Sequence, residues 1–548
     1  MSVKIIPQTQ SSYPYPLLIK QLIKPALIHS PGQEIIYKDK VRYDYVTLSK
    51  RVAQLANALG DIGVEQGNTV AVMDWDSHRY LECFFAVPMM GAVLHTINIR
   101  LTPEQLVYTI NHAEDDVILV NSDFLPLLET VKDKLKTVKK IILLTDGSTA
   151  FEICLSIDDE YEKMIEKCSD EYEFSDFDEN AMATCFYTTG TTGLPKGVYF
   201  SHRQIVLHTY GLMSALCSYK THYSVDSGDV YMPLTPMFHV HAWGMPYLFT
   251  MMGNKQVYPG KYEPEMLLKL IADEKVTFSH CVPTIIHMLL NSPVIDKIDL
   301  SNWTVVIGGA ALSKGLCKAA LDHNINIYGA YGMSETCPLL TVANLKERML
   351  DWDKNDQTNV RCRTGLPVPL VDLEIINTSG KPLPHDGKNT GEVVVRSPWL
   401  TLGYIKAPDK SEELWEDGWL HTGDIGSIDR DGYLQITDRL KDVIKTGGEW
   451  LSSLELEDII SQHPAVSEAA AIGLPNEKWG ERPLVFVVLK KEFENKVTPD
   501  ELKEFYVQYV EKGIIPKYGI PGEIKIVEEI AKTSVGKINK KELRKSYR

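Results

Sequence analysis

The segment Tyr187-Thr-Thr-Gly-Thr-Thr-Gly-Leu-Pro-Lys-Gly197 combines three features of a loop that binds phosphate. Its glycines let backbone N–H groups approach anionic oxygens closely, and its threonine hydroxyls donate further hydrogen bonds. Lys196 adds a positive charge at the end of the loop. The spacing from Gly190 to Lys196 does not match G-x-x-x-x-G-K-[ST], so the loop is not of the Walker A type. A plain Thr/Gly turn is the alternative, but so dense a run of these residues favours a phosphate loop.

Helix patterns and strand patterns alternate along the chain before this loop. Apolar residues recur with helical spacing from Thr47, and a short apolar strand follows at Thr69-Val-Ala-Val-Met73. A second helix is predicted after Thr102, which forms a capping box with Gln105. Another apolar strand is predicted at Asp116-Val-Ile-Leu-Val120. This alternation predicts an α/β fold, with a large N-terminal domain of largely parallel sheets covered by helices.

The C-terminal part of the chain has the pattern of a smaller α+β unit. The predicted elements are a strand at 391–395, a hairpin at Asp429-Arg-Asp-Gly432, a strand at 442–445, a helix from Ser453, a strand at 484–489 and a helix capped by Thr498 and Glu501. We place a domain boundary near Asp438 to Lys441. The sequence therefore predicts two domains, residues 1–438 and residues 439–548.

The overall composition is that of a globular protein, with 44% apolar and 24% charged residues. The formal net charge of −16 argues against a broad surface for nucleic acid. Nine cysteines without a CxxC pair favour reduced thiols over a disulfide framework or a zinc site. No signal peptide and no membrane-spanning stretch is visible, so a cytoplasmic location is expected.

Further segments with chemically distinctive residues follow the threonine-rich loop in a defined order. They are Pro236-Met-Phe-His-Val-His-Ala-Trp243, Gly308-Gly-Ala310, Tyr328-Gly-Ala-Tyr-Gly-Met-Ser-Glu-Thr336, Trp419-Leu-His-Thr-Gly-Asp424, Asp438-Arg-Leu-Lys-Asp-Val-Ile-Lys-Thr-Gly-Gly-Glu-Trp450 and Lys532-Thr-Ser-Val-Gly-Lys537. In this order they resemble the motifs of the adenylate-forming superfamily, and the resemblance covers almost the whole chain. The chain is most similar there to ATP-dependent acyl-CoA synthetases of the medium- and long-chain fatty acid–CoA ligase type.

The resemblance implies an acid–CoA ligase that works in two steps. The carboxylate of the acid attacks the α-phosphate of ATP, and pyrophosphate leaves. The thiol of coenzyme A then attacks the acyl-adenylate, and AMP leaves. ATP, Mg²⁺ and coenzyme A are therefore the implied cofactors. Chemistry of this kind depends mainly on positioning and charge neutralisation, which explains the polar and cationic motifs.

The resemblance also implies roles for the residues around ATP. The residues that would bind the phosphates of ATP are Thr188, Thr189, Gly190, Thr191, Thr192 and Lys196. The residues that would surround adenine are Gly309, Ala310, Tyr331 and Gly332, with Tyr331 stacked on the ring. Asp424 would accept the ribose hydroxyls, and Arg439 would contact ribose or phosphate. Glu335, with Thr188, would hold Mg²⁺, a cation that prefers oxygen ligands. Thr336 would contact the α-phosphate.

Lys537 is the implied catalytic cation of the first step, stabilising charge on the carboxylate and α-phosphate oxygens. A lysine near a polar C-terminus is more often a solvated surface residue, and only its motif reverses that interpretation. The segment departs from the family in one respect, because Ala531 stands where relatives carry proline before the basic-Thr pair. The loop is expected to be slightly less rigid for this reason, with the role of Lys537 unchanged.

The second step implies a rotation of a mobile C-terminal domain. Lys441 occupies the hinge position, and the residues that would border the pantetheine tunnel are Gly447, Gly448, Glu449 and Trp450. Glycine lets the ligand pass close to the backbone. The alternative for Gly447-Gly448 is a plain turn before the helix at Ser453. The Gly-Gly-Glu-Trp form favours coenzyme A as the acceptor.

The acyl pocket is expected beside His239 and Trp243, with Gly308 and Gly332 as further substrate contacts. His239 would orient the carboxylate end without ionising, and Trp243 resembles a gate to the acyl tunnel, although an ordinary packing role is about equally plausible. The segment is aromatic and apolar, so a short- to medium-chain monocarboxylic acid is predicted. A long-chain fatty acid is the alternative substrate.

Three other functions compete with the ligase hypothesis. A non-CoA adenylating enzyme, such as a luciferase or a peptide-synthetase domain, uses the same first step. A catalytically inactive binding protein would be expected to have lost Lys537, Glu335 or Asp424, and all three are present. A P-loop kinase or ATPase lacks its required spacing here. Resemblance further implies a homodimer built through the N-terminal domain.

Overall fold

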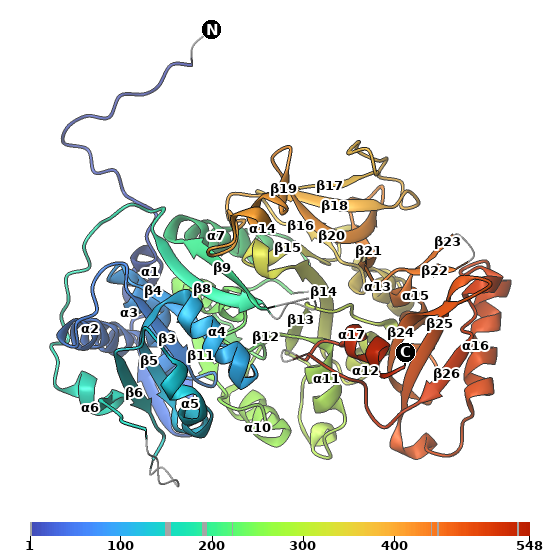
Figure 1. Cartoon of the computed structure of the whole chain (residues 1–548), viewed down its shortest axis with the longest axis horizontal. Coiled ribbons are helices and arrows are strands. Elements are labelled where there is room, and N and C mark those ends of the chain that lie inside the picture. Colours follow the sequence, from blue (N-terminus) through green and yellow to red (C-terminus); the bar gives the residue numbers. More distant parts are fainter. Residues whose placement is uncertain are drawn as a thin grey trace.

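The computed structural model describes residues 3–147, 155–188, 194–221, 223–439, 441–446, 449–533 and 536–547. It contains two large sheets, a smaller antiparallel sheet and a separate C-terminal sheet (Figure 1). The α-helices of the described residues are α1 (Lys20–His29), α2 (Tyr45–Asp61), α3 (His78–Met89), α4 (Pro103–Ala113), α5 (Leu125–Val131), α6 (Tyr161–Glu166), α7 (His202–Cys217), α8 (Val240–Trp243), α9 (Met245–Met252), α10 (Pro264–Glu274), α11 (Pro283–Leu290), α12 (Lys314–Asp322), α13 (Lys354–Arg361), α14 (Pro408–Glu412), α15 (Ser453–Ser461), α16 (Pro499–Glu511) and α17 (Lys540–Ser546).

The first large sheet carries the threonine-rich loop at one edge. Its strand order is β7-β6-β5-β3-β4-β8-β9, and all neighbours are parallel except β8 and β9. The strands are β3 (Thr69–Met73), β4 (Val93–Thr96), β5 (Asp115–Asn121), β6 (Lys140–Leu144), β7 (Asp159–Glu160), β8 (Met182–Thr188) and β9 (Lys196–Ser201). The predicted parallel, helix-covered sheet is confirmed, and β3 has the predicted bounds.

The second large sheet carries the adenine and acyl motifs at the ends of its strands. Its order is β16-β15-β14-β13-β12-β10-β11-β1-β2, with a parallel centre and antiparallel edges. The strands are β1 (Glu34–Tyr37), β2 (Val41–Asp44), β10 (Val230–Tyr231), β11 (Lys255–Tyr258), β12 (Phe278–Cys281), β13 (Thr304–Ile307), β14 (Asn326–Gly332), β15 (Leu339–Val342) and β16 (Leu366–Pro367). Because parallel strands end at the same edge, loops that are distant in sequence meet there.

The third sheet is antiparallel and completes the large N-terminal domain. It consists of β17 (Asp372–Ile376), β18 (Gly391–Arg396), β19 (Trp415–Glu416), β20 (Trp419–Ile428) and β21 (Leu434–Arg439). The predicted hairpin joins β20 to β21: Asp429 N–H donates to Tyr433 O over 3.1 Å, and Gly432 has a φ of +86°. This hairpin places the two predicted nucleotide contacts, Asp424 and Arg439, in register on neighbouring strands.

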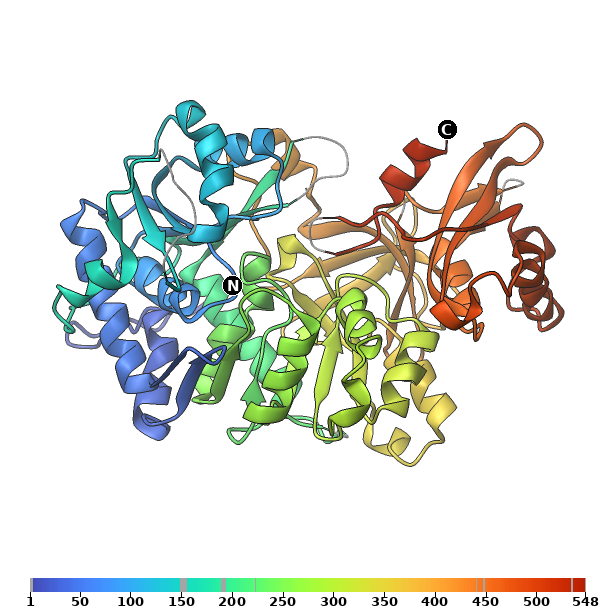
Figure 2. The same cartoon turned by 90° about the horizontal axis from the view of Figure 1, so that it is seen from below.

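The small C-terminal domain is an α+β unit with its own sheet. Its strands are β22 (Ile444–Thr446), β23 (Glu449–Leu451), β24 (Val466–Asn476), β25 (Gly480–Leu489) and β26 (Glu523–Ile526). One face packs against α15 and α16 and the other against α17, giving two separate apolar cores. Figure 2 shows this domain beside the second sheet, with the C-terminal helix turned toward the rest of the protein.

Several predicted boundaries are wrong, the largest difference being at β25, which begins at Gly480 and not at Leu484. Local hydrogen bonds explain two of the others. Helix α2 begins at Tyr45, two residues before Thr47, because the Asp44 carboxylate caps it by accepting the Thr47 N–H over 2.8 Å. Strand β22 begins at Ile444, two residues later than predicted, because Asp442 N–H bonds Arg439 O in a turn. Both predicted capping boxes, at Thr102 and Thr498, are confirmed.

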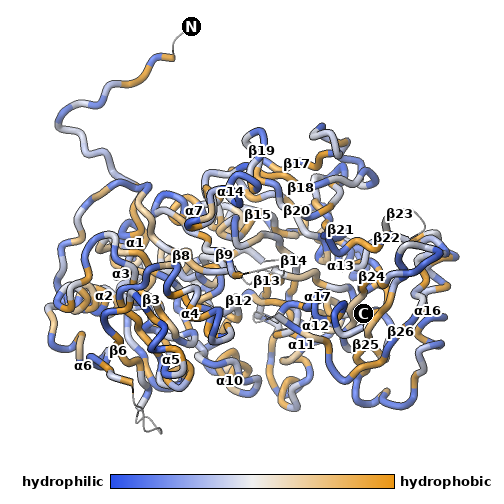
Figure 3. Tube along the Cα trace, in the orientation of Figure 1, coloured by the Kyte–Doolittle hydropathy of each residue, from blue (hydrophilic) through white to orange (hydrophobic). Residues whose placement is uncertain are grey.

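Apolar residues are concentrated along the strands and the inner helix faces (Figure 3). The N-terminal arm, residues 3–15, carries apolar residues that are not buried, since it extends away from the body of the protein in Figure 1. The exposed apolar side chains of this arm are Val3, Ile5, Ile6, Tyr13 and Tyr15. Among the described helices, none is long and apolar enough to cross a membrane.

Candidate active site

The ends of β8 and β9 bring together the two predicted phosphate contacts of the threonine-rich loop that the structure describes. Thr188 ends β8 and Lys196 begins β9, and they are direct partners in the antiparallel pair. The hairpin therefore holds a hydroxyl and an ammonium group at the base of the loop. The other predicted phosphate contacts, Thr189, Gly190, Thr191 and Thr192, lie outside the described residues.

Tyr404 connects Lys196 to Glu335, a link that no local sequence pattern indicates. The Lys196 ammonium lies 4.4 Å from the centroid of the Tyr404 ring. The Tyr404 hydroxyl donates to Glu335 Oε1 over 2.8 Å, across 69 residues of sequence. A backbone bond of 2.8 Å from Ile405 N–H to Gly197 O ties this segment to β9. Tyr404 thus orients both a predicted phosphate contact and the predicted metal ligand.

Glu335 and Thr336 form a short 3₁₀ turn after β14. Glu335 is almost fully buried, and its Oε1 accepts the Tyr404 hydroxyl. A buried carboxylate beside the ammonium and hydroxyl of the hairpin supplies the oxygen ligand that a hard cation bound with phosphate prefers, so the residues fit Mg²⁺. The Thr336 hydroxyl donates within its own turn, to Met333 O over 3.1 Å and to Pro338 O.

Tyr331, Asp424 and Arg439 form a hydrogen-bonded cluster from three strands. The Tyr331 hydroxyl donates to Asp424 Oδ2 over 2.6 Å, and Arg439 Nε lies 3.2 Å from Asp424 Oδ1. Burial, followed by the Asp424 charge, raises the pKa of Tyr331, so its hydroxyl stays protonated and keeps donating. Gly332 follows directly, and a Cβ there would lie 1.8 Å from Pro338 O, so no larger residue fits.

Gly308 and Gly309 make room for two different predicted site residues. A Cβ added at Gly308 would lie 2.8 Å from the Trp243 ring atom Cη2. A Cβ added at Gly309 would lie 2.8 Å from Lys537 Cε and 3.3 Å from its Nζ, and Gly309 has a φ of +74°. The backbone between β13 and α12 therefore separates the tryptophan of the acyl segment from the lysine of the C-terminal domain.

Lys537 reaches this site from the C-terminal domain. The Thr284 hydroxyl donates to Gly536 O over 3.3 Å, which fixes the residue before the lysine against α11. Burial, followed by the charge of Arg439, lowers the pKa of Lys537 to about 8, although Asp424 and Glu335 oppose that effect. The ammonium is therefore close to the predicted ribose, phosphate and metal contacts at once.

Backbone hydrogen bonds close the loop around Lys537, although Ala531 stands where relatives carry proline. Asn539 N–H donates to Ala531 O over 2.8 Å, and Thr533 N–H donates to Lys537 O over 2.6 Å. An isolated bridge pairs Lys532 with Ile538. These bonds close the loop without a proline.

The segment after His239, labelled α8, is a left-handed turn and not a regular α-helix. Val240, His241, Ala242 and Trp243 have φ between +47° and +59°, and Gly244 has +74°. Left-handed backbone costs about 1–2 kcal/mol for each non-glycine residue, so tertiary contacts must stabilise the turn. Burial, followed by Lys537, lowers the pKa of His239 to about 3, which keeps its imidazole neutral. A neutral ring fits an orienting role.

Asp76, in the loop after β3, and Thr96, the last residue of β4, hold the backbone that leads into this turn. Asp76 Oδ1 accepts the Met237 N–H over 2.8 Å, and the Thr96 hydroxyl donates to Phe238 O over 3.0 Å. Burial raises the pKa of Asp76 to about 7, opposed by a 2.5 Å hydrogen bond from Tyr262. Sequence analysis missed both anchors, because they act on backbone atoms more than 140 residues away.

The predicted hinge and tunnel segment is described only in part. Lys441 has an exposed side chain, and partial desolvation of its ammonium, followed by the charge of Arg439, lowers its pKa. Gly447 and Gly448 lie outside the described residues, and for Glu449 and Trp450 only the backbone of β23 is described. Asp438, three residues before Lys441, accepts the Ser453 N–H and hydroxyl over 2.7 Å each, which ties the first residue of α15 to the end of β21.

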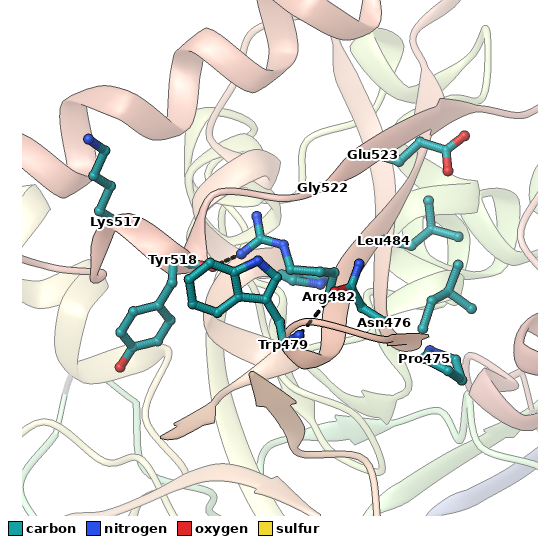
Figure 4. Close-up of a pocket in the computed structure, with 11 residues that line it drawn as sticks. Pro475, Asn476, Trp479, Arg482, Leu484, Lys517, Tyr518, Gly522 and Glu523 are labelled. Atoms are coloured by element: carbon teal, nitrogen blue, oxygen red, sulfur yellow. Dashed lines mark hydrogen bonds between the residues drawn. The ribbon is translucent and has the colours of Figure 1, made fainter. Parts of the chain in front are cut away.

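A cavity of about 780 Å³ lies in the C-terminal domain beside this segment (Figure 4). Its lining combines the aromatic rings of Trp479 and Tyr518 with charged groups of both signs, from Arg482, Lys517 and Glu523. The Arg482 guanidinium donates to Tyr518 O and Ile520 O. Gly480, next to Trp479, pairs with Thr446, the last described residue before Gly447. The cavity therefore lies beside the end of β22.

Comparison with known protein families gives two matches along the chain. Residues 24–405 match the family described as AMP-binding enzyme, and residues 455–537 match the AMP-binding enzyme C-terminal domain. The two matches follow each other in the order that the motifs predict.

Individual relatives match over nearly the whole chain. The long-chain-fatty-acid–CoA ligase of Thermus thermophilus is 38% identical over 92% of this chain and 90% of its own. The 3-methylmercaptopropionyl-CoA ligase of Ruegeria pomeroyi is 37% identical over 97% of this chain and 98% of its own. The solved structure of the anthranilate CoA ligase AuaEII with anthranoyl-AMP has the same fold, with a TM-score of 0.84, 24% identity and coverage of 98% and 99%.

Proposed function

Because the chain belongs to the AMP-binding enzyme family and is an acid–CoA ligase, we propose that its substrate is a short- to medium-chain monocarboxylic acid. The tail of this acid is uncharged, with a hydroxyl or thioether group allowed. The observation that carries the proposal is the apolar wall behind His239, where buried Trp243 covers Gly308. Long-chain fatty acids are the runner-up.

In the proposed first step, the residues around ATP position it and neutralise charge. A carboxylate oxygen attacks the α-phosphorus, and the bond to the β-phosphate oxygen breaks, so pyrophosphate leaves with that electron pair. Lys196 and Thr188, with the loop between them, hold the departing phosphates. Lys537 stabilises the charge on the α-phosphate and carboxylate oxygens. Asp424 binds the ribose hydroxyls, and Tyr331 stacks on adenine.

Glu335 and Thr188 are the proposed protein ligands of Mg²⁺. When bound, the ion neutralises phosphate charge and so favours the departure of pyrophosphate. The chain contributes the orientation of this carboxylate, since Tyr404 fixes Glu335 Oε1 through its hydroxyl.

In the proposed second step, the thiolate sulfur of coenzyme A attacks the acyl carbon. The bond from that carbon to the AMP oxygen breaks, and AMP leaves. We place the adenine nucleotide of coenzyme A in the cavity of Figure 4, because aromatic faces and cations suit an adenine ring that carries phosphates. From there the pantetheine arm would pass the Gly447-Gly448 backbone.

We also propose that residues 1–438 and 439–548 are the two moving parts, with Lys441 as the hinge between them. The third sheet ends at β21, and the C-terminal sheet begins at β22, which supports a division in the short segment between them. Rotation about this hinge would withdraw Lys537 and bring the tunnel segment to the adenylate.

The chain-length prediction follows from the Trp243 wall. Butyrate and octanoate should be used with higher kcat/KM than palmitate, and Trp243→Ala should shift the preference toward longer chains, because removing the ring opens space behind Gly308. Acyl-CoA formation measured for the three acids, with both proteins, tests this. Efficient use of succinate by the unmodified enzyme would contradict the apolar pocket and would point to Arg100, whose charge acts on His239.

Two alternatives have distinct outcomes in the same assay. A preference for palmitate before any substitution would identify a long-chain ligase. Acid-dependent pyrophosphate exchange without any acyl-CoA product would identify an adenylating enzyme with another acceptor.

We further propose a cytoplasmic homodimer. The eight described cysteines carry free thiols, as in a reducing compartment. The exposed apolar arm at residues 3–15 supports association through the N-terminal domain. Light scattering at micromolar concentration should therefore give twice the chain mass of 61.8 kDa. A single mass of 61.8 kDa would contradict the dimer.

A further inference from the structure

The C-terminal domain contacts helices α11 and α12 at a surface away from the reacting groups. Asp458 of α15 accepts the Lys314 N–H at the start of α12 over 2.9 Å, and Lys314 Nζ lies 3.7 Å from the same carboxylate. His287 Nε2 of α11 lies 2.7 Å from Ser467 Oγ of β24. These contacts join the two domains across more than 140 residues of sequence.

Gly315, next to Lys314, lies where α15 comes close to the backbone of α12. A Cβ added at Gly315 would lie 2.2 Å from Ser461 O and 2.9 Å from Ser461 C, both backbone atoms of α15. Gly315 is the second residue of α12 and is not among the positive-φ residues, so its own conformation does not require glycine. Glycine is also a poor helix former, so only the approach of α15 explains its presence.

This surface is continuous with the contact that places Lys537. Thr284, one turn before His287 on α11, donates to Gly536 O, and Lys537 then lies against Gly309. An outward shift of α15 from α12 would move Lys537 in the same rigid domain. Catalytic groups tolerate such shifts poorly, since a displacement of about 1 Å can cost about 100-fold in rate.

We propose that Gly315 is a positioning residue for the first step of the reaction. Its missing side chain lets α15 dock on α12 in the one orientation that delivers Lys537, and Asp458 with the His287–Ser467 pair stabilises that orientation. The proposal rests on the two-step function with domain rotation proposed above, because the thioester step would use a different orientation. The surface should therefore matter for adenylation and not for thioester formation.

Gly315→Ala tests the proposal in separate half-reactions. We expect the kcat/KM of acid-dependent pyrophosphate exchange to fall by roughly 10- to 100-fold. Formation of acyl-CoA from synthetic acyl-AMP should remain at the level of the unmodified enzyme. The thermal midpoint should not fall, because alanine stabilises a helix relative to glycine.

Gly60→Ala is the matched control, since Gly60 also lies in a helix, α2, and an added Cβ there meets nothing within 4 Å. It should leave both half-reactions unchanged. Asp458→Ala is the second variant, because it removes the contacts to Lys314 without adding atoms. It should lower pyrophosphate exchange in the same direction as Gly315→Ala, again without loss of the thioester step.

The outcomes separate this proposal from the proposed function. Normal pyrophosphate exchange in Gly315→Ala, or an equal loss of both half-reactions, would overturn the docking role. Selective loss of exchange in both variants, with a normal Gly60→Ala, would support it. The unmodified enzyme tests the function on its own, because failure to make acyl-CoA from any short- or medium-chain acid would contradict the proposed substrate class whatever the variants do.

Discussion

Lys537→Ala is expected to lower the kcat/KM of adenylation by about 100- to 1,000-fold, the usual effect of removing one group that stabilises developing charge. Lys537 lies against Gly309, and its charge interacts with Asp424 and Glu335 at the predicted nucleotide site. Its ammonium is needed when pyrophosphate leaves and not when the thiol attacks. Thioester formation from synthetic acyl-AMP should therefore survive the substitution.

Lys541→Ala provides the control, because Lys541 is an exposed lysine four residues further along the chain. It should leave both half-reactions intact. A parallel loss of adenylation and thioester formation in Lys537→Ala would show that the lysine supports the fold and not the first step.

The pH dependence gives an independent readout of the same residue. Burial lowers the pKa of Lys537 to about 8, so its ammonium is charged below that pH and is lost above it. The kcat/KM of adenylation, which reports the free enzyme, should therefore decline as the pH rises through about 8. The decline should be absent from the residual activity of Lys537→Ala.

Lys441→Pro is expected to have the opposite pattern, with thioester formation lost by about 100-fold or more and pyrophosphate exchange retained. Proline fixes φ near −65°, so a hinge that must change its backbone angles is held in one orientation. A bulky residue at Gly448 should give the same pattern by obstructing pantetheine. Pyrophosphate exchange and acyl-CoA formation, measured side by side, provide the test.

Lys441→Ala separates hinge freedom from charge, since alanine removes the ammonium and leaves φ free. It should retain both half-reactions. Equal losses in both assays for Lys441→Pro would exclude the two-orientation hypothesis for this chain.

Local signals predicted the parts of the fold that depend on neighbouring residues. The capping boxes at Thr102 and Thr498, the strand at Thr69–Met73 and the Asp429 hairpin were predictable, because each depends on residues a few positions apart. Motif resemblance identified the family, because the motifs keep their order along almost the whole chain.

Contacts between residues far apart in the chain could not be predicted from the sequence. In the sequence, Tyr404 is an ordinary aromatic residue. In the fold, its ring lies beneath Lys196 and its hydroxyl donates to Glu335. Asp76 resembles a turn residue until it accepts the Met237 N–H. No sequence pattern marks Gly315 as important, because the need for glycine there comes from the backbone of Ser461 in the other domain. Tertiary structure alone creates these roles.

The left-handed turn at Val240–Gly244 has a consequence for how such an enzyme diverges. Its entry is held through main-chain atoms, the Met237 N–H and the Phe238 carbonyl, by Asp76 and Thr96. Because these hydrogen bonds involve the backbone, the turn can keep its backbone conformation when its side chains are exchanged. Mutations in the turn can therefore reshape the acyl pocket while leaving the scaffold in place, so new acid preferences can evolve by single substitutions without rebuilding the adenylation machinery.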